Sequence, residues 1–108
     1  DDIREAPSLV LIEQLINEGA FVVAFDPVAE ENAKKQFGSR INYGKDPYAT
    51  VEGCDCLVIV TELDTFRYLD KQKVKKLMKT PCIVDARNIY DPKEMRDAGF
   101  TYLSIGRK

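Results

Sequence analysis

Hydrophobic and polar positions along the chain fall into blocks that predict helices and strands in alternation. From residue 7 to 18, apolar residues recur at 9, 12 and 16 and also at 11 and 15, the spacing of a helix with one buried face. Short runs rich in β-branched and aromatic residues predict strands. These runs lie at 21–25, 40–44, 56–61, 82–86 and 100–105. The first, FVVAF, has no polar position, which is typical of a strand buried on both faces of a parallel sheet.

Aspartates mark the expected helix starts. Three helices are predicted to begin at Asp-Pro pairs, namely Asp26-Pro27, Asp46-Pro47 and Asp91-Pro92. The carboxylate accepts hydrogen bonds from the free amides of the first turn, and proline presets φ. Asp70 predicts one more helix start by the same reasoning. The residues of that helix expected to face inward are Val74, Leu77 and Met78.

The alternation of helix and strand defines the expected fold. It favours right-handed crossovers and therefore an α/β fold, with a doubly wound, mainly parallel, Rossmann-like sheet and helices on both faces. Such a sheet ordinarily begins with a strand, whereas this chain begins with a helix, so we expect the first strand to lie upstream of Asp1. With 108 residues, the chain has room for one core and one domain.

Charge and composition exclude several classes of partner. The formal net charge of −2 provides no basic field to recruit nucleic acid or an anionic membrane. The longest apolar runs, LVLI and FVVAF, are far shorter than a membrane span. The opening stretch DDIREAPS has neither the basic nor the apolar region of a signal peptide. We therefore predict a cytoplasmic protein.

The sequence offers little for metal binding or acid–base catalysis. Its three cysteines, Cys54, Cys56 and Cys82, are an odd number, as expected of free thiols in a reducing compartment. A structural zinc site needs about four Cys or His ligands, and the chain has no histidine. The absence of histidine also excludes a histidine-based nucleophile or acid–base pair. We predict no metal site and no catalytic residue in this chain.

Dinucleotide and acidic sites are weakly supported. Neither the Gly-x-Gly-x-x-Gly fingerprint nor a phosphate loop is present, so this chain is not expected to hold NAD in the usual Rossmann way. Asp26 ends a strand like the acidic residue that binds an adenosine ribose, but the helix N-cap is the favoured interpretation. Asp55, Glu62 and Asp64 could form an acid cluster, although a solvated loop is favoured.

Two arginines are stronger candidates. Arg4 precedes the first helix, where a cation and a helix N-terminus can meet a phosphate together. Arg87, in the stretch VDARNIYDP, follows the expected fourth strand. Ligands of open α/β sheets bind at the carboxyl ends of the strands. Either arginine alone is commonly a surface salt-bridge residue, but together on one sheet edge they predict an anion site.

Several stretches resemble a known family. DDIREAPS, GAFVVAFDP, CDCLVIVTELDTF and DARNIYDP with the later GFTYLSIGR are similar, in order and spacing, to the C-terminal UDP-binding domain of the UDP-glucose/GDP-mannose dehydrogenases. The resemblance covers nearly the whole chain. It implies NAD-dependent oxidation of a sugar nucleotide's C6 alcohol to a carboxylate, with two NAD reduced, for polysaccharide biosynthesis. UDP-glucose is the expected substrate. The alternative substrates are GDP-mannose and UDP-N-acetyl-mannosamine. The alternative to a dehydrogenase domain is a non-catalytic α/β regulatory module.

The resemblance also implies roles for particular residues. Arg4, in the D-D-I-R-E motif, would reach NAD, and Arg87, in the D-[GA]-R-N motif, would contact the UDP-sugar. The family's usual glycine before that arginine is Ala86 here, which adds a methyl group at a tight place in the backbone. Residues 1–108 would form a single sugar-nucleotide-binding domain, a non-catalytic fragment of a larger dehydrogenase. Two further domains of the same enzyme would lie outside this fragment. The N-terminal domain would make most of the contacts with NAD, and the central domain would carry the nucleophilic cysteine. The whole enzyme would be a homo-oligomer.

Overall fold

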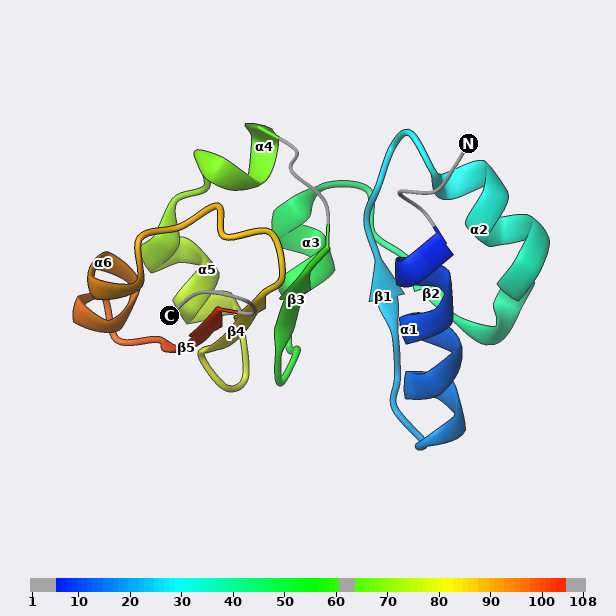
Figure 1. Cartoon of the computed structure of the whole chain (residues 1–108), viewed down its shortest axis with the longest axis horizontal. Coiled ribbons are helices and arrows are strands. Elements are labelled where there is room, and N and C mark those ends of the chain that lie inside the picture. The colour runs from blue at the N-terminus through cyan, green and yellow to red at the C-terminus, as the bar shows by residue number, and fades with distance from the viewer. Residues whose placement is uncertain (1–5, 61–63, 105–108) are drawn as a thin grey trace. The chain divides into compact units, whose positions relative to one another are not determined.

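The computed structural model describes residues 6–60 and 64–104. The chain divides into two compact units, Asp1–Asp46 (unit 1) and Pro47–Lys108 (unit 2), and each is described here by itself (Figure 1). Among the described helices, none has the length and apolar character needed to cross a membrane.

Unit 1 is built from two helices and a two-stranded parallel sheet. Its elements are α1 (Ala6–Asn17), β1 (Val23–Ala24), α2 (Glu30–Phe37), a 3-10 helix (Gly38–Arg40) and β2 (Asn42–Tyr43). β1 pairs in parallel with β2, and α1 lies alongside β1 (Figure 1). The buried centre is formed by Ala33, Phe37 and Ile41. Half-buried residues of α1 pack against it, namely Leu9, Ile12 and Ile16. The predicted apolar face is thereby confirmed at positions 9, 12 and 16, whereas Leu11 and Leu15 are half-buried and are not part of this cluster.

Two expectations for unit 1 were wrong in detail. The FVVAF stretch is not buried on both faces, because β1 is only half-buried and Phe21 is 97% exposed. Val22 and Ala24 pack against the buried centre of unit 1, and a strand buries its second face only where a further layer covers that face. The second helix begins at Glu30 and not at Pro27. The Asp26 carboxylate instead caps the preceding turn, accepting from the amides of Val28 (2.9 Å) and Ala29 (3.2 Å).

Unit 2 contains a three-stranded parallel sheet with its helices. The elements are α3 (Pro47–Val51), β3 (Leu57–Ile59), α4 (Asp64–Arg67), α5 (Lys71–Leu77), β4 (Cys82–Asp85), α6 (Pro92–Asp97) and β5 (Thr101–Ser104). The strand order is β3-β4-β5, and both pairs are parallel. An α/β fold with parallel strands, as in a Rossmann-like doubly wound fold, is therefore confirmed. Among the described residues the strands pair as a two-stranded and a three-stranded sheet.

Local signals placed the helices of unit 2 well. The Asp70 side chain accepts from the amide of Lys73 at the start of α5, and Asp91 does the same for Glu94 at α6. Val74 and Met78 are buried as expected, whereas Leu77 is half-buried. The four-residue helix α4 was not predicted, because so short a helix carries no periodic signal.

The pairing of the strands determines which side chains share the inner face of this sheet. Leu57, Ile83 and Tyr102 stand in one row across the three strands, and Ile59, Asp85 and Ser104 form the next row of the same face. The intervening row, Val58, Val84 and Leu103, lies on the opposite face. A carboxylate thus occupies a fully buried position of an otherwise largely apolar inner face.

Candidate functional site

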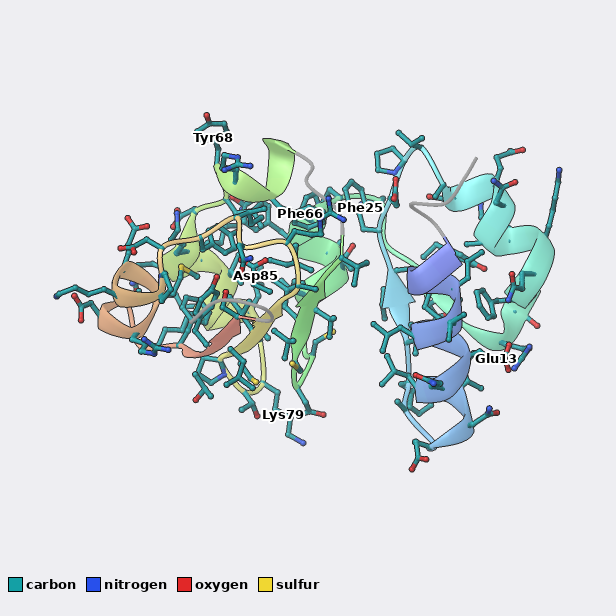
Figure 2. The ribbon with its side chains drawn as sticks, viewed as in Figure 1. Glu13, Phe25, Phe66, Tyr68, Lys79 and Asp85 are labelled. Carbon is teal, nitrogen blue, oxygen red and sulfur yellow. The ribbon has the colours of Figure 1, made fainter. Side chains whose placement is uncertain are left out.

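The most unusual group in unit 2 is the carboxylate of Asp85, the last residue of β4, which is 0% exposed. Its Oδ1 accepts from the amide of Arg87 at 3.0 Å. Its Oδ2 accepts from the amides of Ile89 (2.9 Å) and Tyr90 (3.1 Å) and from the Tyr102 hydroxyl (2.6 Å). Figure 2 shows Asp85 in the interior of unit 2. Burial of a carboxylate is costly unless its oxygens are satisfied, and here four donors satisfy them.

These bonds fix the chain that follows β4, residues 85–90, which we call the Asp85 loop. Asn88 has a φ of 59°, the left-handed region that asparagine adopts more readily than most residues. The Ser104 hydroxyl of β5 donates to the Asn88 side-chain oxygen. The loop is therefore held on both sides of Arg87, by the Asp85 carboxylate and by β5.

Tyr90 anchors the far end of the Asp85 loop. Its hydroxyl donates to the carbonyl oxygen of Phe66 in α4, and its ring is buried. Burial, and then the nearby negative charge of Asp85, raises the pKa of the Tyr90 phenol well above its ordinary value. The phenol therefore stays neutral and acts as a hydrogen-bond donor. This bond ties the end of the loop to α4.

Arg87 is exposed between these anchors, directly beyond the carboxyl end of β4. This is the sheet edge at which the sequence predicted it. Arg4, the other predicted anion-binding residue, lies outside the described residues. Whether the two arginines share one site therefore stays a prediction, while the placement of Arg87 at a strand end is confirmed.

Ala86, which replaces the family's usual glycine, fits the local backbone. Its amide donates to the Ile59 carbonyl at 2.9 Å and so extends the pairing between β3 and β4. Among the described non-glycine residues, only Asn88 has a positive φ. Ala86 therefore does not occupy a backbone conformation that requires glycine.

The other acidic residues considered as site candidates are not shown to form a binding site. The Asp26 carboxylate accepts from turn amides and does not cap α2, so the favoured interpretation of Asp26 as a helix N-cap was wrong. Asp55 is exposed, whereas Glu62 and the side chain of Asp64 lie outside the described residues. The acid cluster therefore stays untested.

The glycines do not fit a dinucleotide pyrophosphate. Gly19, Gly38, Gly53 and Gly99 all have positive φ, and each stands just after the end of a helix. This is the C-terminal closing position of a helix, whereas a phosphate cradle needs glycines before a helix N-terminus. The described residues thus provide no pyrophosphate cradle for NAD.

The sequence reasoning missed Asp85 as the organiser of the site. The signal was an aspartate that ends an apolar strand, CIVD, and precedes a polar loop. Tyr102 carried no such signal, because its hydroxyl meets Asp85 only through the pairing of β4 with β5.

Residues 1–92 match the sequence profile of the UDP-glucose/GDP-mannose dehydrogenase family, UDP binding domain. The match covers most of the chain, including the whole Asp85 loop, so the chain belongs to this family. This confirms the resemblance drawn from its motifs.

Individual relatives agree with this assignment. The chain is 47% identical to the UDP-glucose 6-dehydrogenase of Pseudomonas aeruginosa, over 99% of this chain and 25% of that protein. It is 43% identical to the Rhizobium meliloti UDP-glucose 6-dehydrogenase, over 99% of this chain and 24% of the relative. For the Bacillus subtilis enzyme the identity is 40%, over 99% and 23% respectively. The chain therefore spans about a quarter of the length of these curated relatives.

Proposed function

We propose that this chain binds the UDP part of a sugar nucleotide for an NAD-dependent UDP-glucose 6-dehydrogenase, which oxidises UDP-glucose to UDP-glucuronate with two NAD reduced. The observation that carries the proposal is the Asp85 loop, which lies within the family match and presents an exposed arginine at a strand end. The similarity to UDP-glucose 6-dehydrogenases supports UDP-glucose over the family's other substrates.

Arg87 is the proposed substrate-binding residue. A guanidinium is permanently charged and presents parallel N–H groups that match the oxygens of a phosphate or a sugar. The Asp85 carboxylate fixes the Arg87 backbone before any ligand arrives. The loop therefore loses less conformational entropy when a ligand binds, which favours a higher affinity.

Other parts of the proposal reach beyond the described residues. Arg4 is proposed to contact NAD, with most of the NAD-binding surface supplied by an N-terminal domain of the same enzyme. Residues 1–108 are proposed to act as one sugar-nucleotide-binding domain, alongside that domain and a central one. The enzyme is proposed to be a cytoplasmic homo-oligomer.

The test uses the full-length protein that carries this chain. NADH formation would be followed by absorbance with UDP-glucose, GDP-mannose and UDP-N-acetyl-mannosamine as separate substrates. We expect turnover with UDP-glucose and two NADH per sugar. Turnover with one of the other two sugar nucleotides alone would keep the family assignment and overturn the choice of sugar.

The role of Arg87 is tested with matched arginine variants. Arg87→Ala should raise the KM for UDP-glucose by about tenfold to a hundredfold, since a hydrogen bond to a charged group contributes about 1.5–3 kcal/mol. Arg87→Lys should recover only part of this loss, because an ammonium lacks the planar fork. Arg96→Ala, which removes another exposed arginine of unit 2, should match the wild type. A wild-type KM in Arg87→Ala would contradict the proposed role.

A further inference from the structure

At the opposite end of the three-stranded sheet from the Asp85 loop, two thiols face each other across neighbouring strands. Leu57 of β3 is paired with Ile83 of β4, so Cys56 and Cys82 occupy the positions one residue before that pair. The Sγ of Cys56 lies 3.5 Å from the Sγ of Cys82 and donates a hydrogen bond to it. Both are free cysteines, Cys56 exposed and Cys82 half-buried.

The backbone spacing suits a covalent bond between them. Neighbouring strands lie about 4.8 Å apart, which is within the Cα–Cα range of about 4.4–6.8 Å found for disulfides. The two sulfurs must approach from 3.5 Å to about 2.05 Å. A movement of this size needs small changes in the two side-chain torsions and leaves the strand pairing intact.

The third cysteine is held elsewhere. The Cys54 thiol donates to the carbonyl oxygen of Thr50 in α3 at 3.2 Å. Its own carbonyl accepts from the amide of Lys79, which Figure 2 labels. The geometry thus distinguishes one pair among the three possible ones.

We propose that Cys56 and Cys82 form a reversible dithiol site, which a peroxide converts to an intrachain disulfide between β3 and β4. The exposed Cys56 sulfur attacks one peroxide oxygen, the O–O bond breaks, and a sulfenic acid and one water form. The Cys82 sulfur then displaces the hydroxyl group as a second water, and the S–S bond forms. The two sulfurs lose two electrons and two protons in total, and the peroxide takes up both. The inference is independent of nucleotide binding.

At rest the pair is expected to remain as two thiols. Although Cys56 is exposed as a whole residue, partial burial of its sulfur, followed by the hydrogen bond with Cys82, raises the pKa of the Cys56 thiol above its ordinary value. The thiolate is the form that attacks peroxide, so oxidation should require peroxide in excess and should not proceed under ordinary reducing conditions.

The experiment is peptide mapping of the full-length protein after treatment with hydrogen peroxide, without reduction. Cleavage before aspartate separates the cysteines, because Asp55 lies between Cys54 and Cys56. The cysteine peptides that come from residues 1–108 are then 46–54, 55–63 and 70–84. We expect a cross-linked species of 55–63 with 70–84, lighter than the sum of its parts by two hydrogens and removed by dithiothreitol.

Serine variants serve as matched controls. Cys54→Ser should retain the cross-link, whereas Cys56→Ser and Cys82→Ser should abolish it. A trivalent arsenical, which bridges two close thiols, should bind once to the reduced wild type and to Cys54→Ser but not to the other two variants. A cross-link through peptide 46–54, or oxidation of Cys56 to sulfinic acid with no cross-link and no arsenical binding, would overturn the proposal.

Discussion

The two units of the chain organise their centres differently. In unit 1 the centre is apolar, with Ala33, Phe37 and Ile41 packed against α1 and a sheet of only two strands. Unit 2 has three strands, and its buried inner face includes the ionisable side chain of Asp85. An apolar centre stabilises a unit without specifying a loop, because hydrophobic burial has no direction. A buried carboxylate needs donors at fixed positions, and in unit 2 it obtains them from the loop that carries Arg87.

The largest expected effect comes from removing the polar centre of unit 2. Asp85→Ala leaves the amides of Ile89 and Tyr90 without their acceptor, whereas the Tyr102 hydroxyl keeps its bond to the Tyr90 carbonyl. Each orphaned buried donor costs about 1–3 kcal/mol, so the loss of acceptor for these two amides should lower the free energy of unfolding by about 2–6 kcal/mol. Urea denaturation would measure the loss.

Two control variants separate the loss of the buried carboxylate from the loss of a single donor or of any carboxylate. Tyr102→Phe removes only one donor to the carboxylate and should cost about 1.5–3 kcal/mol. Asp97→Ala removes an exposed carboxylate paired with Lys93 on α6 and should change stability by less than about 0.5 kcal/mol. Equal losses for Asp85→Ala and Asp97→Ala would contradict a structural role for the buried group.

High pH should weaken unit 2 through Tyr90. The folded chain holds the Tyr90 proton more tightly than the unfolded chain, because burial and Asp85 raise the pKa of the phenol. Above about pH 10 the unfolded state therefore binds fewer protons, and stability falls with rising pH by up to about 1.4 kcal/mol per pH unit. Below that range both states keep the proton and this contribution is constant. Unfolding measured from pH 8 to 11 should show this slope in the wild type and a shallower one in Tyr90→Phe.

A smaller loss of stability, equal in the two units, is expected when a buried isoleucine of each unit is replaced by valine. Ile41 in unit 1 is 4% exposed and Ile83 in unit 2 is 1% exposed. Replacing either by valine should cost about 0.5–1.5 kcal/mol, because each substitution deletes one buried methyl group. A cost near zero at Ile41 beside a full cost at Ile83 would show that the centre of unit 1 is not well packed in solution.

Interactions between residues close in the sequence could be predicted, whereas interactions between distant residues could not. Asp70 and Asp91 were predicted as helix starts because each carboxylate accepts a hydrogen bond from an amide only three residues further along the chain. The burial of FVVAF was mispredicted, because it depends on which distant segments cover the two faces of β1. The site shows the same division. Arg87 could be placed at a strand end from the pattern alone, whereas the bond between Asp85 and Tyr102 joins residues seventeen positions apart.

The central claim is that Asp85 supports nucleotide binding by holding Arg87, and a double-mutant cycle tests it most directly. The dissociation constant for UDP would be measured by calorimetry on the full-length wild type, Asp85→Asn, Arg87→Ala and the double variant. We predict that each single substitution weakens binding, by about tenfold or more for Arg87→Ala, and that the double variant binds no more weakly than Arg87→Ala alone. Fully additive losses, or wild-type affinity in a folded Asp85→Asn protein, would contradict the claim.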